Sequence, residues 1–199
     1  GADILLKGSG NISQATNIVV DTDGGDITYW ADSDNNNAGH IYLDIAFAGN
    51  STAVNSNGGN IVFGGGTDPS TDEAVGSISG VYLFNSSVDA GSGNITMRGR
   101  SIRTDNHYGV GVSVYGSNVM GGDIQITGVG SASAGGLGNN WGVGFTVNSL
   151  VRASGEINIL GTAGGQNSSG GDNYGVRVEN ATVETTASGA LTITGNGGA

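Results

Sequence analysis

The chain has 199 residues, among them 40 glycines, 1 proline and no cysteine. This length fits one domain with a sizeable core, and the glycines follow no Gly-X-Y period, which excludes a collagen triple helix. With 17 acidic and 6 basic side chains the net charge is −11. We expect no nucleic-acid binding, because such a surface repels phosphate backbones. No run of 18 apolar residues is present, so we expect no insertion of a helix into a membrane.

In chain order, the first element that recurs is a short strand with the pattern Gly-(polar)-Ile-x-(apolar) or a close variant. It occurs seven times, and its first apolar positions are 23, 34, 34, 29, 33 and 34 residues apart. The two apolar positions flank a mostly polar one, which is typical of a strand with one buried face. The predicted inward-facing pairs are Ile4 and Leu6, Ile27 and Tyr29, Ile61 and Phe63, Ile95 and Met97, Ile124 and Ile126, Ile157 and Ile159, and Leu191 and Ile193.

Two further strands are predicted within each period. The first has the pattern (Tyr/Trp)-Gly-Val-x-(apolar) and occupies 108–112, 141–145 and 174–178, with weaker versions at 79–83 and 38–43. The second centres on a valine shortly before the next Gly-(polar)-Ile segment. These valines are Val54, Val88, Val119, Val151 and Val183.

Three short strands per period, with turns rich in Gly, Asn and Ser, are typical of one coil of a parallel β-solenoid. We therefore predict an all-β parallel β-helix of about seven coils of 23–34 residues, with no significant α-helix and a single domain over residues 1–199. The longer periods carry extra residues mostly between the Ile-x-Ile strand and the (Tyr/Trp)-Gly-Val strand. These inserts are expected to stack at one corner of the coil.

Asparagine marks another corner. Asn85, Asn148 and Asn180 occupy equivalent positions before the third strand, and Gly116 takes that position in one coil between them. Both residue types tolerate a left-handed backbone. We predict that geometry here, with an amide ladder broken at Gly116.

Three segments resemble the repeats of a known family: "GGDITYWADSDNNNAGHIYL", "SNGGNIVFGGG" and "DAGSGNITMRG". They are similar to filamentous haemagglutinin-like exoproteins, which are very large bacterial surface adhesins. The resemblance covers essentially the whole chain. It implies a right-handed β-helix shaft, secretion to the bacterial cell surface, and an origin in the interior of a longer repeat protein. The implied partners are the flanking coils of that protein, with surface glycans as candidate ligands.

Two other functions remain open on the sequence. One is a filament subunit that assembles end to end with copies of itself through open terminal coils. The other is a polysaccharide-active enzyme, whose candidate groups form the only basic cluster of the chain. These groups are Arg98, Arg100, Arg103 and His107, beside Asp105. Adjacent coils do not repeat the cluster, and we expect no enzyme activity.

Three aromatic residues indicate where a ligand would bind. Tyr108, Trp141 and Tyr174 are spaced by 33 residues and are predicted to share one repeat position at the insert corner. Stacked on adjacent coils, they would form an aromatic column able to bind sugar rings, or else a ladder packed under the inserts. The polar residues predicted to join them are Asn139, Asn140, Asp172 and Asn173.

A group of aspartates near the N-terminus is the candidate metal site. Its members are Asp21, Asp23, Asp26, Asp32 and Asp34, which flank one predicted strand. Clustered carboxylates and amides supply the oxygen ligands that Ca²⁺ prefers. The alternative is that these carboxylates are solvated turn residues, because neither an EF-hand loop nor a calcium-binding nonapeptide repeat is present.

Overall fold

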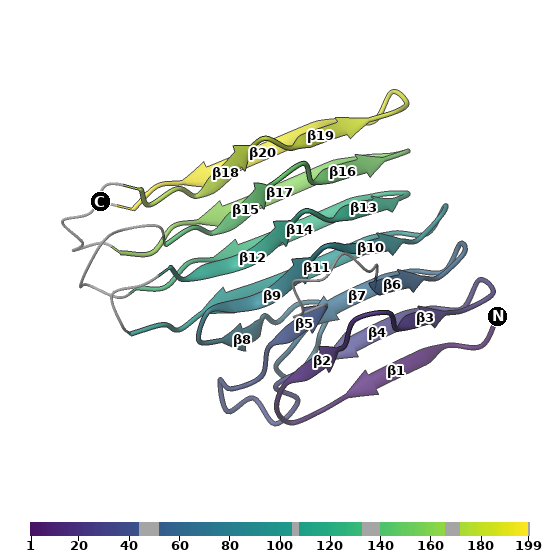
Figure 1. Cartoon of the computed structure of the whole chain (residues 1–199), viewed down its shortest axis with the longest axis horizontal. Coiled ribbons are helices and arrows are strands. Elements are labelled where there is room, and N and C mark those ends of the chain that lie inside the picture. Colours follow the sequence, from purple (N-terminus) through teal and green to yellow (C-terminus); the bar gives the residue numbers. More distant parts are fainter. Residues whose placement is uncertain (44–51, 105–107, 133–139, 166–171, 199) are drawn as a thin grey trace.

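The computed structural model describes residues 1–43, 52–104, 108–132, 140–165 and 172–198, and within these ranges every regular element is a β-strand. The strands stack in three parallel sheets whose order follows the chain, so the protein is a parallel β-solenoid (Figure 1). The described residues include no helix able to cross a membrane.

Each turn of the chain adds one strand to each sheet. The first sheet contains β1 (Ile4–Lys7), β4 (Ile27–Trp30), β7 (Ile61–Gly64), β11 (Ile95–Ser101), β14 (Ile124–Val129), β17 (Ile157–Thr162) and β20 (Leu191–Asn196). The second sheet contains β2 (Ile12–Gln14), β5 (Ile41–Leu43), β9 (Ser79–Phe84), β12 (Val110–Tyr115), β15 (Val143–Thr146) and β18 (Val176–Glu179). The third sheet contains β3 (Val19–Asp21), β6 (Thr52–Asn55), β10 (Ser86–Asp89), β13 (Asn118–Gly121), β16 (Leu150–Ala153) and β19 (Thr182–Thr185).

The predicted register of the first and third sheets is confirmed. Ile4 pairs with Ile27, Ile27 with Ile61, and the ladder continues to Leu191. The valines of the third sheet pair in the same way from Val20 to Val183. Side chains from these ladders fill one continuous core, because each inward position meets its own counterpart in the coils above and below.

The prediction of seven coils is slightly too high. The second and third sheets contain six strands each, and therefore only five coil-to-coil pairings, while β20 adds a seventh strand to the first sheet alone. One insert also contributes more than a loop. Its strand β8 (Ala74–Gly76) pairs in parallel with the end of β11 and extends the first sheet locally.

The register predicted for Tyr108 is wrong by two residues. Val112, and not Val110, pairs with Val143, which in turn pairs with Val176. Val110 therefore shares its position with Trp141, and Tyr108 lies two residues earlier in its coil. A shift of two residues preserves the face of a strand, so the inward and outward assignments were unaffected.

Glycine allows the first and second sheets to touch at the insert corner. A Cβ atom on Gly99 would lie 2.3 Å from the carbonyl oxygen of Gly111, and one on Gly161 would lie 1.9 Å from that of Gly175. Sheets that pack through side chains are about 10 Å apart. Here the two backbones are in contact, so the coil narrows to a wedge along the side that carries the inserts.

The left-handed backbone predicted at the asparagine corner is confirmed, with φ of 46° at Asn85, 59° at Asn148 and 47° at Asn180, and 58° at Gly116. The clearest side-chain ladder, however, lies at the corner before the first sheet. Each Asp or Asn there accepts, through Oδ1, a hydrogen bond of 2.7–3.0 Å from the backbone amide of its counterpart one coil later. The acceptors are Asp3, Asp26, Asn60, Asn94 and Asp123.

Candidate functional site

The outer face of the second sheet carries the largest group of aromatic side chains among the described residues. Because successive side chains point to opposite faces, the residues between the buried positions of β9, β12, β15 and β18 face outward. One outward row, read across these strands, contains Tyr82, Ser113, Gly144 and Arg177. The next contains Phe84, Tyr115, Thr146 and Glu179.

Aromatic rings lie in contact across this face. Phe84 and Tyr115 stack with centroids 5.0 Å apart, and the Tyr82 ring lies 5.9 Å from Phe84. Tyr42 meets Tyr82 edge to face at 5.6 Å. Because each ring touches the next, the four rings form a continuous aromatic surface. Such ring pairs also add stability beyond the burial of their surface.

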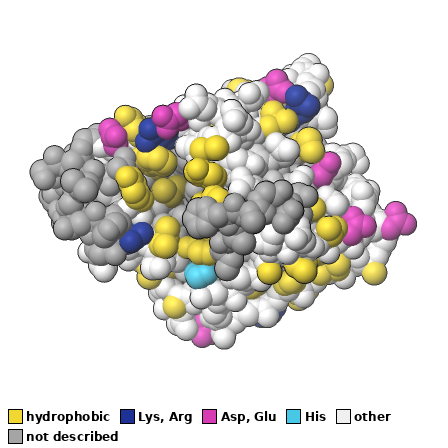
Figure 2. Space-filling view, viewed as in Figure 1, with side chains coloured by type: hydrophobic (Ala, Val, Ile, Leu, Met, Phe, Trp, Pro, Cys, Tyr) yellow, Lys and Arg dark blue, Asp and Glu magenta, His cyan; other side chains and the backbone are white. Residues whose placement is uncertain are grey.

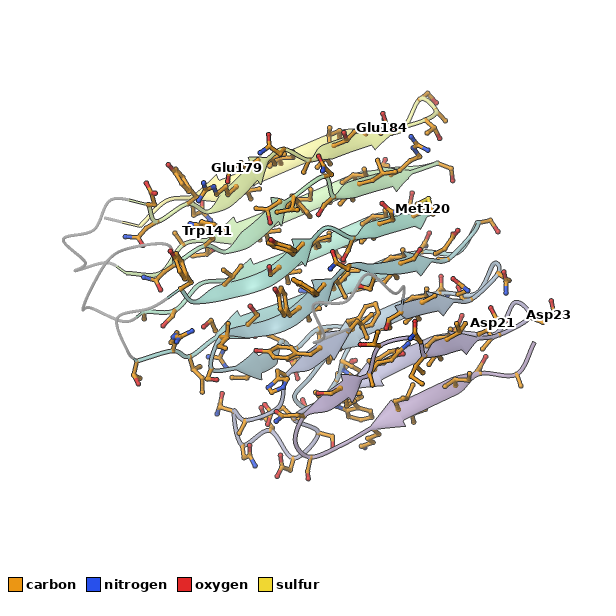
Figure 3. The ribbon with its side chains drawn as sticks, in the orientation of Figure 1. Asp21, Asp23, Met120, Trp141, Glu179 and Glu184 are labelled. Atoms are coloured by element: carbon orange, nitrogen blue, oxygen red, sulfur yellow. The ribbon has the colours of Figure 1, made fainter. Side chains whose placement is uncertain are left out.

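Trp141 is fixed at the edge of this surface. Its Nε1 donates a hydrogen bond of 2.8 Å to the carbonyl oxygen of Asp172. The indole lies over Gly144, since a Cβ there would come within 3.0 Å of the ring. The Arg177 guanidinium lies 4.3 Å from the ring centroid and forms an ion pair of 2.6 Å with Glu179. Figure 3 shows Trp141 and Glu179 at the same end of the molecule.

These side chains line an open groove of about 720 Å³, which we call the aromatic groove. Figure 2 shows hydrophobic side chains gathered on this face of the molecule. The lining residues are Ile78, Ser79, Tyr82, Tyr108, Val110, Ser113, Tyr115, Trp141, Thr146, Val147, Asp172, Arg177 and Glu179. The groove thus crosses four successive coils and combines aromatic walls with a few polar groups, as ligand sites commonly do.

The groove presents a neutral phenol at Tyr82 and, among its described lining residues, a small excess of negative charge. Burial, with smaller contributions from Tyr115 and Tyr42, raises the pKa of Tyr82 to about 12, so its hydroxyl keeps its proton at neutral pH. Among the described lining residues, Arg177 is the one cation and is paired with Glu179, whereas Asp172 adds a second carboxylate.

The structure brings together only some of the predicted ligand-binding residues. Tyr108, Trp141 and Asp172 line the groove, and Tyr108 is 57% exposed. Tyr174 lies beside the groove. Its ring centroid is 5.7 Å from the Arg177 guanidinium carbon, and its hydroxyl is 3.3 Å from Asp172 Oδ1.

The predicted asparagines have different surroundings. Asn140 is buried, and its backbone and side-chain nitrogens donate to Asn173 Oδ1 at 3.3 and 3.4 Å. Asn139 lies outside the described residues. Asn140 and Asn173 therefore connect neighbouring coils beside the groove.

Sequence reasoning missed Tyr82, Phe84 and Tyr115, which make up most of the aromatic surface. A signal for them exists: "VYLF" and "VSVY" alternate in the same phase, so their outward residues fall in neighbouring coils. The repeat pattern does not identify these residues, because aromatic side chains do not recur at their positions in every coil.

The predicted calcium residues separate into two places. Asp21, Asp23 and Asp26 lie before β4, and Figure 3 places Asp21 and Asp23 at the opposite end of the molecule from Trp141. Asp32 and Asp34 follow β4; Asp32 is buried and accepts a hydrogen bond of 3.2 Å from the amide of Ala38. Among the described residues, no three acidic or histidine side chains are grouped as a metal site would need. Calcium binding stays a prediction.

The arginines of the basic cluster bind different segments of the chain. Arg98 Nε donates to Ser70 O at 2.7 Å, and an Arg100 terminal nitrogen donates to Asn37 Oδ1 at the same distance. Arg103 donates to the carbonyl oxygen of Tyr108 at 3.1 Å. His107 and Asp105 lie outside the described residues. Arg98 and Arg100 thus connect inserts of earlier coils to the first sheet.

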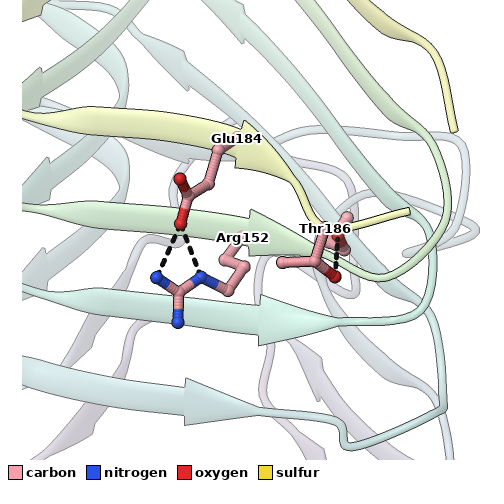
Figure 4. A network of polar contacts seen from close by, with 4 residues as sticks. Arg152, Glu184 and Thr186 are labelled. Atoms are coloured by element: carbon pink, nitrogen blue, oxygen red, sulfur yellow. Dashed lines mark hydrogen bonds and ion pairs between the residues drawn. The ribbon is translucent and has the colours of Figure 1, made fainter. Parts of the chain in front are cut away.

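The outer face of the third sheet carries an ion pair where the second sheet carries aromatic rings. Arg152 and Glu184 occupy paired positions on β16 and β19 and form an ion pair of 2.6 Å (Figure 4). Their side chains are 45% and 40% exposed, and exposed pairs contribute little stability.

No model of a known protein family matches the chain. Comparison with curated proteins and with solved structures likewise finds no significant match.

Proposed function

We propose that this chain is a shaft segment of a secreted bacterial surface adhesin. The observation that carries the proposal is the continuity of the three ladders, in which each coil pairs in register with the next. A solenoid of this kind is a rigid, extended scaffold. The resemblance of its repeats to filamentous haemagglutinin-like exoproteins supports the extracellular assignment.

Recognition is proposed to take place on the side that carries the inserts. The shaft strands must match the coils above and below them, whereas the inserts and the outward residues beside them are free to vary. Tyr108, Trp141 and Asp172 lie near the ends of three successive inserts and line the aromatic groove. Connecting segments carried by a rigid scaffold are a usual place for binding.

The end coils are proposed to pack against further coils. Leu191 and Ile193 occupy core-type positions of β20 but are 44% and 43% exposed, whereas Ile124 and Ile126 of β14 are buried. A following coil of the same shaft would cover Leu191 and Ile193 and pair with the free edge of β20.

Shortening two inserts tests the binding role. Segments 133–139 and 166–171 are replaced by short turns, which leaves Asn140, Trp141 and Asp172 in place. We expect an unchanged far-ultraviolet circular dichroism spectrum, because the first coil closes with a spacing of only 23 residues between Ile4 and Ile27. We also expect weaker adhesion to cells or immobilised glycans than the wild-type chain shows.

Two results would contradict the proposal. Adhesion that is unchanged in the shortened protein would place recognition away from the inserts. A wild-type chain that adheres to no cell or glycan surface would remove the adhesin assignment.

A further inference from the structure

We propose that the aromatic groove binds an uncharged oligosaccharide lying along the stack of coils. The inference rests on the adhesin function above and assigns its ligand to one face, the outside of the second sheet. It also names residues that no repeat pattern identifies, above all Tyr82, Ser113 and Tyr115.

The shape of the groove follows from one outward row. Tyr82, Ser113, Gly144 and Arg177 pair in sequence across four coils; the small Ser113 lines the groove between Tyr82 and Arg177, and the Trp141 indole lies over Gly144. Neighbouring strands are about 4.8 Å apart, and the row extends about 14 Å along the stack. This length suits a short segment of a polymer.

The walls suit sugar rings. Tyr82 stands at one end of the row, and the Trp141 indole covers Gly144 from the side. Tyr115 and the 57% exposed Tyr108 also line the groove. Aromatic faces pack against the apolar faces of pyranose rings, while phenol, serine and threonine hydroxyls bind sugar hydroxyls.

The charges favour an uncharged chain. Arg177 is neutralised by Glu179 at 2.6 Å, and Asp172 adds a further negative charge. Sulfated or carboxylated saccharides would meet net repulsion, both here and from the overall charge of −11. A peptide is disfavoured for another reason: β9, β12 and β15 each pair with a strand on both sides, so along most of the groove no free strand edge is available to extend.

The groove is organised before any ligand arrives. The indole nitrogen of Trp141 is bound to Asp172, its ring is covered by Arg177, and Arg177 is held by Glu179. Fixed walls reduce the entropy lost on binding.

The two tryptophans of the chain provide a direct test. Trp30 lies on the first sheet, where its Nε1 donates to Gly66 O at 2.8 Å. In the Trp30→Phe protein, the tryptophan fluorescence therefore comes from Trp141 in the groove alone. In the Trp141→Phe protein, which is the matched control, it comes from Trp30 alone. Neutral hexasaccharides of glucose, N-acetylglucosamine and mannose serve as probes, with a heparin hexasaccharide as the charged counterpart. We expect a saturable fluorescence change with a neutral probe in the Trp30→Phe protein and none in the control.

A pair of substitutions locates the site. Ser113→Phe fills the floor of the groove, whereas Ser87→Phe places the same side chain on the outer face of the third sheet. Both positions face outward, so both proteins are expected to keep the melting temperature of the parent. Affinity for the neutral probe should fall by about ten-fold or more in Ser113→Phe and stay unchanged in Ser87→Phe. Tyr108→Ala, which removes an exposed ring, should weaken binding without affecting the fold.

Three outcomes would overturn the inference: a response to the heparin probe alone, no response to any neutral probe at millimolar concentration, or unchanged affinity in Ser113→Phe. Adhesion that survives Ser113→Phe but is lost on shortening the inserts would reject this site and retain the proposed function.

Discussion

Gln14 is a polar residue at a core position. It pairs with Leu43 in the second sheet, where later coils carry apolar residues, and it is 6% exposed. Its Nε2 donates to the carbonyl oxygens of Ile18 and Ala53 at 2.8 and 3.1 Å, and its Oε1 accepts from the Tyr29 hydroxyl. Burial raises the pKa of Tyr29, so the phenol stays a donor.

Removing both partners of this pair should cost less than the sum of the two single removals. Tyr29→Phe leaves Gln14 Oε1 unpaired, and Gln14→Leu leaves the Tyr29 hydroxyl unpaired, at a cost of about 1–3 kcal/mol each. The double variant carries the same side chains as Leu43 and Phe63, the residues with which positions 14 and 29 pair in the next coil. Its loss of stability should therefore be smaller than the sum of the losses of the two single variants. Urea denaturation of the four proteins measures this coupling. Additive losses would show that the two side chains act independently.

His40 gives the stability a pH dependence near neutrality. It stacks on Tyr42 at 3.8 Å, and burial lowers its pKa below the ordinary 6.5. The unfolded chain then binds the proton more tightly, so stability should decrease as the pH falls from about 7.5 to 5.5. His40→Phe keeps the stacked ring and should reduce this slope. His107 is present in both proteins, so the comparison of their denaturation midpoints isolates His40; equal slopes would contradict the prediction.

At the scale of the strands, the contact between the first and second sheets depends on glycine. In the coil of β17 and β18, the backbones of Gly161 and Gly175 are so close that no methyl group fits between them. A side chain at either position would force two parallel ladders apart.

Gly161→Ala should therefore destabilise the chain by about 1–3 kcal/mol, as overpacking does. Its new Cβ would lie 1.9 Å from the Gly175 oxygen, and a backbone atom cannot move aside like the end of a side chain. Gly10→Ala is the matched control, because no atom lies within 4 Å of its Cβ position. Thermal melting of the two proteins makes the comparison. A similar melting temperature for both would mean that the sheets separate easily at this corner.

At the scale of the whole molecule, the solenoid is a stack in which the strands of each coil pair with those of its neighbours. Stability in such a stack is a sum over coils and their interfaces. The inner coils bury their core residues on both sides, as with Ile95 and Ile124 at 1% exposure. The outermost strand β20 is exposed along its whole length.

Hydrogen exchange should follow this increase in exposure from the inner coils to β20. We expect the backbone amides of β11 and β14 to exchange most slowly and those of β18, β19 and β20 fastest, because local opening begins where fewest contacts are lost. Exchange measured by mass spectrometry on the intact chain resolves these segments. Uniform protection from β1 to β20 would indicate that the stack opens as a single unit.

The sequence by itself determined the ladders of the first and third sheets. Alternation of apolar and polar residues reports which face of a strand is buried, and the recurrence of Gly-(polar)-Ile and of the valines sets which strands are equivalent. The spacing of the repeats cannot distinguish two strand registers that differ by two residues, since both registers bury the same face of the strand. "YGVGV" contains Gly-Val twice, and only pairing with β9 and β15 assigned Val112 rather than Val110.

The aromatic groove was decided by the tertiary structure. Tyr82, Ser113, Tyr115 and Trp141 come from three coils, and the residue types at their positions do not recur from coil to coil. What joins them is the stacking of coils that differ in length, together with the small side chains between the large ones. Periodicity describes what each coil has in common with the next. The groove is built from their differences, which come together only when the strands are placed side by side.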